Sequence, residues 1–134
     1  MPFQVHVLVL IKKELKEKRI RIAVLDTGYD PDAVFFNKDR KRRLRSWRNY
    51  IEEDQPHANG EDGHGTHVVS VLMKVAPAAD IFVARVTQDA TDLQNASGNI
   101  AQAIKWAWKD CKANIITMSF GFDAEILVDN KAGH

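Results

Sequence analysis

RIRIAVLDTG, residues 19–28, contains an unbroken apolar run from Ile22 to Leu25 that ends abruptly on an aspartate. A strand whose apolar residues follow one another, without alternating polar ones, is typical of a parallel sheet covered on both faces. Two further runs of this kind follow along the chain, ADIFVARV (residues 79–86) and ANIITMSFG (residues 113–121). The three stretches predict neighbouring strands of one parallel sheet.

Two helical patterns separate these runs. The first is HGTHVVSVLMKV (residues 64–75), and the second lies within NASGNIAQAIKWAWKDCK (residues 95–112). Alternation of strand and helix predicts an α/β fold, here a partial doubly wound parallel sheet with flanking helices. In the second pattern one helix face is expected to be apolar, and its residues are Ile100, Ala103, Ile104, Ala107, Trp108 and Cys111.

The composition is that of an ordinary globular domain. The chain has 134 residues, of which 45% are hydrophobic and 28% are charged, which is enough for one domain with a core. The formal net charge of +1 gives no reason to expect a nucleic-acid partner.

The N-terminal run VHVLVLI (residues 5–11) is too short to span a bilayer, and no basic residues precede it. We therefore expect no signal peptide and no membrane partner, and we interpret the run as a strand or the start of a helix. Cys111, the single cysteine, cannot form an internal disulfide, which favours a reducing compartment. Together these features predict an intracellular, cytoplasmic protein.

NKDRKRRLRSWRNYIEED (residues 37–54) is the strongly charged region of the chain. A run of lysine and arginine can mark a nucleic-acid patch or a nuclear-localisation signal, but such short runs are frequent false positives. Glu52, Glu53 and Asp54 follow and balance the charge. We interpret the region as a solvated loop that leads into a short strand around LRSWRNYI.

Asp26 stands directly after the first predicted strand. Catalytic and ligand-binding groups gather at the carboxyl ends of parallel strands, and a carboxylate there needs a partner. The alternative is an aspartate that only starts a turn, because Asp-Thr-Gly is also good turn chemistry. Aspartic proteases use the same tripeptide twice, and a second copy is absent from this sequence.

His64 is flanked by Gly63 and Gly65 at the start of the first predicted helix. A general base requires a neutral imidazole whose second ring nitrogen is held by a carboxylate, and Asp26 can supply that carboxylate. Thr66 is expected to cap the helix. The alternative, a metal site on His64 and His67, lacks the H-E-x-x-H pattern, so His67 is expected to be a buried structural histidine and no metal is predicted.

Four of these stretches together resemble successive motifs of the subtilisin-like serine peptidases. IAVLDTG, DGHGTHV, VAPAADIFVARV and NIITMSFG stand in the family's order between Arg19 and Phe122. The resemblance implies a subtilisin-like fold, a serine endopeptidase and a peptide or protein substrate. It also implies that Asp26 is the triad aspartate and His64 the triad histidine. Ser119, Phe120 and Gly121 correspond to the strand that pairs with the substrate backbone.

The sequence also departs from the family pattern. The G-T-S-x-A motif that carries the nucleophile is absent from these 134 residues, and so is the family's oxyanion asparagine. The serines that are present fall in other family positions, and they are Ser46, Ser70, Ser97 and Ser119. The calcium loop found in many members has no counterpart, so we expect no cofactor.

These departures lead to the expectation of a truncated domain. Residues 1–18 are interpreted as an N-terminal lead-in and residues 19–134 as a partial peptidase domain that lacks the C-terminal half. Such a chain is expected to be inactive alone, with the missing half or other domains of a larger protein as partners. The alternative is a non-catalytic fragment that binds peptides or regulates a partner.

Overall fold

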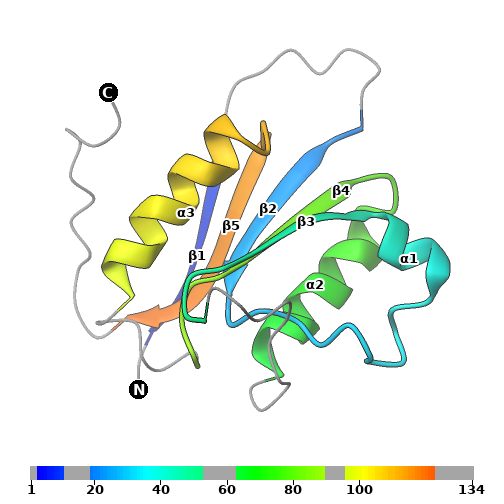
Figure 1. Cartoon of the computed structure of the whole chain (residues 1–134), viewed down its shortest axis with the longest axis horizontal. Coiled ribbons are helices and arrows are strands. Elements are labelled where there is room, and N and C mark those ends of the chain that lie inside the picture. Colours follow the sequence, from blue (N-terminus) through cyan, green and yellow to red (C-terminus); the bar gives the residue numbers. More distant parts are fainter. Residues whose placement is uncertain (1–2, 11–18, 53–62, 90–95, 123–134) are drawn as a thin grey trace.

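Five strands form one sheet in the computed structural model of the chain, which describes residues 3–10, 19–52, 63–89 and 96–122. Across the sheet the strands are ordered β1-β5-β2-β4-β3 (Figure 1). The elements in chain order are β1 (Phe3–Leu10), β2 (Arg21–Asp26), α1 (Lys38–Arg42), β3 (Leu44–Asn49), α2 (His64–Val75), β4 (Asp80–Arg85), α3 (Ser97–Lys109) and β5 (Ile115–Phe122).

The three apolar runs of the sequence are β2, β4 and β5. β2 lies between the other two and pairs with both in parallel, and β3 adds a fourth parallel strand beside β4. In β2 every residue from Ile22 to Asp26 is buried, as expected for a strand with helices on both faces. The predicted α/β class is confirmed.

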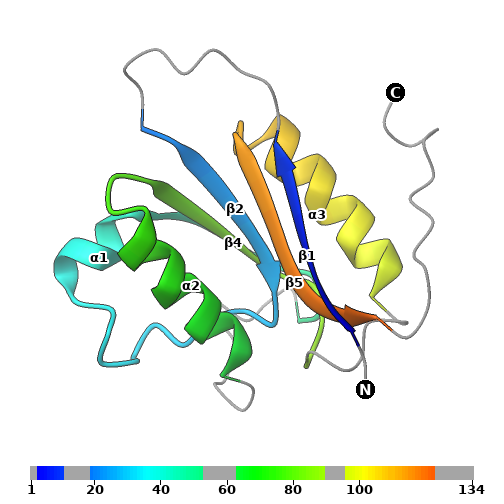
Figure 2. The same ribbon diagram turned by 180° about the vertical axis from the view of Figure 1, so that it is seen from behind.

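Helices cover both faces of the sheet (Figures 1 and 2). Successive residues of β2 point to opposite sides, so Leu25 packs in the α3 layer and Val24 in the α2 layer. The α3 layer is built around Phe82, Ile100, Ala103, Trp106, Ala107 and Ile116. The α2 layer is built around Phe36, Val69, Met73, Ile81 and Val83.

β1 is the antiparallel member of the sheet. It runs along the outer edge of β5, with Phe3 opposite Phe122 and Leu10 opposite Ile115 (Figure 2). Of the two interpretations of the N-terminal run, strand and helix start, the structure has the strand. Residues assigned to a lead-in therefore contribute a strand to the sheet, and β1 and β3 form its two edges.

The basic region is more ordered than a solvated loop. Asn37 caps α1 through its side-chain oxygen, which accepts from the Arg40 backbone N–H at 2.9 Å. The predicted strand around LRSWRNYI is present as β3, although it ends at Asn49. The loop prediction is wrong for α1, a single short helical turn whose residues are all at least partly exposed.

Candidate active site

Asp26 ends β2 at the carboxyl edge of the sheet, and its side chain is completely buried. One carboxylate oxygen, Oδ1, accepts the backbone N–H of Thr27 at 2.8 Å. The strand therefore delivers a carboxylate into the interior at the edge where parallel sheets place their functional groups.

His64 is the first residue of α2, and its Nδ1 lies 2.7 Å from Asp26 Oδ1. The structure thus brings together the two residues that the sequence analysis paired. The His64 side chain is 25% exposed, whereas that of Asp26 is not exposed at all. The pair consequently has a buried carboxylate side and an imidazole that reaches the surface.

Burial dominates the electrostatics of Asp26. Removal from water disfavours the charged carboxylate and raises the pKa of Asp26, while hydrogen bonds from His64 and the Thr27 backbone act in the opposite direction. Both of these hydrogen bonds are to Oδ1, and the other oxygen, Oδ2, is buried without a hydrogen-bond partner among the described residues. A hydrogen-bond donor at Oδ1 stabilises such a buried carboxylate, and the His64 ring supplies one.

The first turn of α2 is fastened to the loop that follows β2. The Gly65 N–H donates to Thr27 Oγ1 at 2.9 Å, and the Asp30 N–H donates to Thr66 Oγ1 at 2.9 Å. A Cβ at Gly65 would overlap the carbonyl oxygen of Gly28, so this glycine is required by the close approach of two backbones. These contacts fix the start of the helix beside Asp26.

Two expectations about this helix are wrong. The N-cap of α2 is Gly63, which has no side-chain capping bond, and Thr66 instead accepts from the loop after β2. His67 is exposed rather than buried, because α2 directs Val69 and Met73 toward the sheet. The hydroxyl of Thr27 is a site feature that the sequence analysis missed, and its signal was a second polar residue directly after the buried strand.

Ser119, Phe120 and Gly121 lie in β5 beyond the point where that strand pairs with β2. The β2–β5 pairing ends at Leu25 and Met118, and on its other side β5 continues against β1 to Phe122. The backbone of residues 119–121 therefore passes the carboxyl end of β2, where Asp26 stands.

Within the described ranges, no group of three or more His, Cys, Asp or Glu residues is arranged to hold a metal ion. No helix in those same ranges is long and apolar enough to cross a membrane.

The profile of the Subtilase family matches residues 17–132. An intracellular serine protease of Paenibacillus polymyxa is 31% identical over 81% of this chain and 35% of its own length. The major intracellular serine protease of Bacillus subtilis is 30% identical over 85% of this chain and 38% of its own length. A subtilisin-like protease of Podospora anserina, het-Q2, is 28% identical over 77% of this chain and 37% of its own length.

The chain thus spans little more than a third of the length of the curated relatives it matches. No solved structure matches it significantly.

Proposed function

Because the chain belongs to the subtilase family, we propose that it supplies the acid–base half of a serine endopeptidase site. Asp26 and His64 are its catalytic carboxylate and imidazole. The contact of 2.7 Å between His64 Nδ1 and Asp26 Oδ1 carries this proposal. The intracellular proteases among the relatives support peptide or protein substrates and an intracellular location.

The pair performs the proton transfers of peptide hydrolysis. Asp26 accepts the Nδ1–H of His64 and so holds the imidazole in one tautomer, with Nε2 as the basic nitrogen. A serine hydroxyl placed at Nε2 loses its proton as its oxygen attacks the scissile carbonyl. The imidazolium then returns that proton to the leaving amine, and water repeats the cycle on the acyl-enzyme.

We do not assign the nucleophile to a serine of these 134 residues. Ser70 donates its hydroxyl to the His67 carbonyl within α2, Ser46 lies in β3, and Ser97 begins α3. The nucleophile and the oxyanion donors belong to the part of the subtilase domain that these residues do not match. The backbone of Ser119, Phe120 and Gly121 is the proposed pairing partner of an extended peptide, which β-strand addition would hold along β5.

A fluorophosphonate probe, which labels activated serines, tests the proposal on the purified chain. We expect neither labelling nor cleavage of an unstructured protein substrate. When the chain is joined to a serine-bearing C-terminal portion of the Bacillus subtilis relative, we expect both to appear and to depend on Asp26 and His64. A joined protein that folds and binds peptides without being labelled supports a non-catalytic peptide-binding role instead. Labelling of the chain alone, abolished by His64→Ala, contradicts the assignment of the nucleophile.

A further inference from the structure

Arg43 belongs to the basic region, which has no part in the proposed function. It stands between α1 and β3, and its half-buried side chain reaches the far end of α2. Nη1 donates to the Met73 carbonyl at 3.1 Å, Nη2 donates to the Ala76 carbonyl, and Nε donates to the Ala79 carbonyl at 3.0 Å. One guanidinium therefore binds three carbonyls at the end of α2 and in the turn after it.

The Met73 carbonyl lies in the last turn of α2, whereas the Ala76 carbonyl also accepts the Ala79 N–H at 3.0 Å and the Ala79 carbonyl also accepts from Arg19. The last carbonyls of a helix have no partner within it, and the C-terminal end of the helix dipole favours a cation. A guanidinium presents several donors in one rigid plane, which a lysine ammonium cannot reproduce. Burial lowers the pKa of Arg43 and neighbouring Arg19 adds to this, so the carbonyls must offset the cost of holding the charge there.

The backbone of Arg43 is fixed as well. Its carbonyl accepts the Ile81 N–H of β4 at 2.7 Å. Arg43 is thus anchored to the sheet through its main chain and to the end of α2 through its side chain. His64 is the first residue of the same continuous helix of 12 residues, so a shift of its last turn along the axis would also shift His64.

At the His64 end, α2 has no side-chain cap, and hydrogen bonds at Gly65 and Thr66 join it to the loop after β2. These bonds hold the first turn of α2 and the contacts of Arg43 hold its last turn, so both ends of the helix set the distance between His64 and Asp26. We propose that Arg43 is a positioning residue, which holds α2 at the axial position where His64 meets Asp26. This inference rests on the proposed function of that pair.

The Nδ1–H proton of His64 gives a direct readout, because a proton shared with a buried carboxylate resonates far downfield and exchanges slowly with water. Loss of this NMR signal in Asp26→Ala assigns it. In Arg43→Met we expect it to move upfield and to exchange about tenfold faster. In Arg43→Lys, which keeps the charge but not the three-way contact, we expect an intermediate result.

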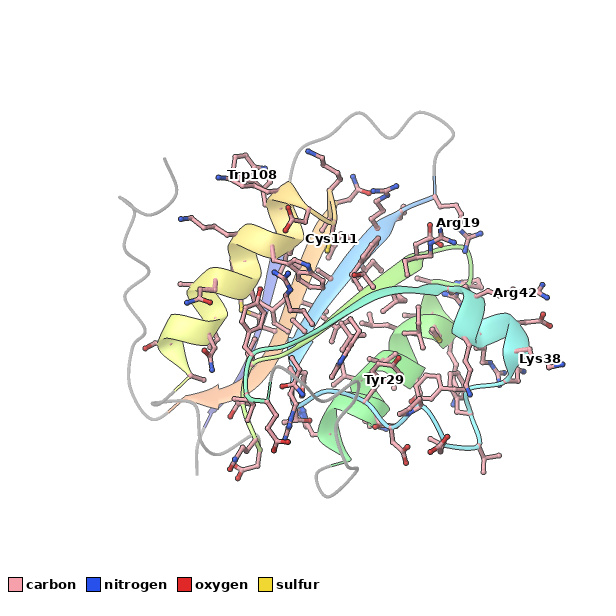
Figure 3. The ribbon with its side chains drawn as sticks, in the orientation of Figure 1. Arg19, Tyr29, Lys38, Arg42, Trp108 and Cys111 are labelled. Carbon is pink, nitrogen blue, oxygen red and sulfur yellow. The ribbon has the colours of Figure 1, made fainter. Side chains whose placement is uncertain are left out.

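Two controls separate positioning from stability. Arg42→Met makes the same change at the adjacent arginine, which points into solvent with its side chain 79% exposed (Figure 3), and we expect the signal to be unchanged. Ile100→Ala destabilises the α3 layer without touching α2, and we expect a lower melting temperature with an unchanged signal. If Arg43→Met does not fold, the comparison of Arg43→Lys with the unsubstituted chain decides.

A wild-type signal in Arg43→Met, or in Arg43→Lys where only that variant folds, overturns the positioning role and leaves the proposed function intact. Absence of the signal from the unsubstituted chain overturns the Asp26–His64 pairing, and both proposals fall with it.

Discussion

Asp26 combines two demands that oppose each other. As the last residue of a buried strand it belongs to the core, yet its proposed role requires a negative charge. The two hydrogen bonds to Oδ1 offset only part of the cost of burial, and the pKa of Asp26 is raised. Functional sites commonly keep groups that destabilise the fold, and replacing such a group stabilises the protein at the expense of activity.

The first prediction follows from this raised pKa. A carboxyl group whose pKa is higher in the folded than in the unfolded chain stabilises the fold at low pH, and that stabilisation is lost as the pH rises through the folded pKa. Asp26→Asn keeps an acceptor at Oδ1 but cannot ionise. We expect its free energy of unfolding to exceed that of the unsubstituted chain by about 1 kcal/mol at neutral pH, a gap that narrows toward acid pH.

Urea unfolding of both chains across this pH range measures the gap. Asp39→Asn, which makes the same change at an aspartate whose side chain is 88% exposed, is the matched control for burial. If the stability advantage of Asp26→Asn over the unsubstituted chain instead grows toward acid pH, the hydrogen bonds from His64 and Thr27 outweigh burial.

Gly65 gives the second prediction, since it lies where α2 meets the loop after β2. In Gly65→Ala the added methyl group overlaps the Gly28 carbonyl, and we expect a loss of about 3 kcal/mol in the free energy of unfolding. Gly63→Ala is the control, because open space surrounds the Cβ there. Equal losses in the two variants, measured by urea unfolding, would contradict the close approach.

At this scale the sequence predicted which residues meet but not how the helix start is held. The position of Asp26 at a strand end and of His64 at a helix start follows from local pattern, because the carboxyl ends of parallel strands share one edge. The roles of Thr66 and His67 depend on which way α2 is rotated about its axis. That rotation is set by the packing of Val69 and Met73 against the sheet, and short-range spacing does not reveal it.

Among the elements, α3 shows how far periodicity reaches. The expected apolar face is largely buried, with Ile100, Ala103 and Ala107 in the core, but Trp108 is 46% exposed and points away from the sheet (Figure 3). Trp106, which the pattern did not select, is buried at 6% exposure. Both tryptophans lie at the margins of the apolar face, so tertiary packing rather than spacing decides which one is covered.

The third prediction compares these two tryptophans. Trp106→Ala leaves a cavity in the α3 layer, and we expect it to lower the free energy of unfolding by about 3 kcal/mol. Trp108→Ala removes a half-exposed ring, and we expect a loss below about 1 kcal/mol. Unfolding followed by far-ultraviolet circular dichroism measures both. A larger loss of unfolding free energy in Trp108→Ala than in Trp106→Ala would contradict the burial of Trp106.

Across the whole molecule, the parallel core was predictable and the partner of β5 at its outer edge was not. The composition and the periodicity of the sequence are enough to predict an α/β fold, from the apolar runs of β2, β4 and β5 and the helices between them. β1 pairs with the strand most distant from it in sequence, and an antiparallel edge strand carries no local sign of its partner. Among the described strands, β5 is therefore paired on both sides, and β1 and β3 are the edge strands.

The last prediction concerns the outer side of α2. Val71 and Val75 stand one helical turn apart and are 40% and 71% exposed, while Val69 and Met73 on the other side are buried. Adjacent exposed apolar side chains bind hydrophobic dyes and promote association, whereas an isolated one does neither.

We expect anilinonaphthalene sulfonate to bind the chain, and Val71→Lys combined with Val75→Lys to remove about half of the dye fluorescence. Val34→Lys, at a valine fully exposed in the loop before α1, is the control and should leave the fluorescence unchanged. Equal dye binding by the double variant and the unsubstituted chain would show that the apolar surface lies elsewhere. In sedimentation experiments we expect the unsubstituted chain to associate and the double variant to remain a monomer at the same concentration, because the added charges on α2 keep two such faces apart.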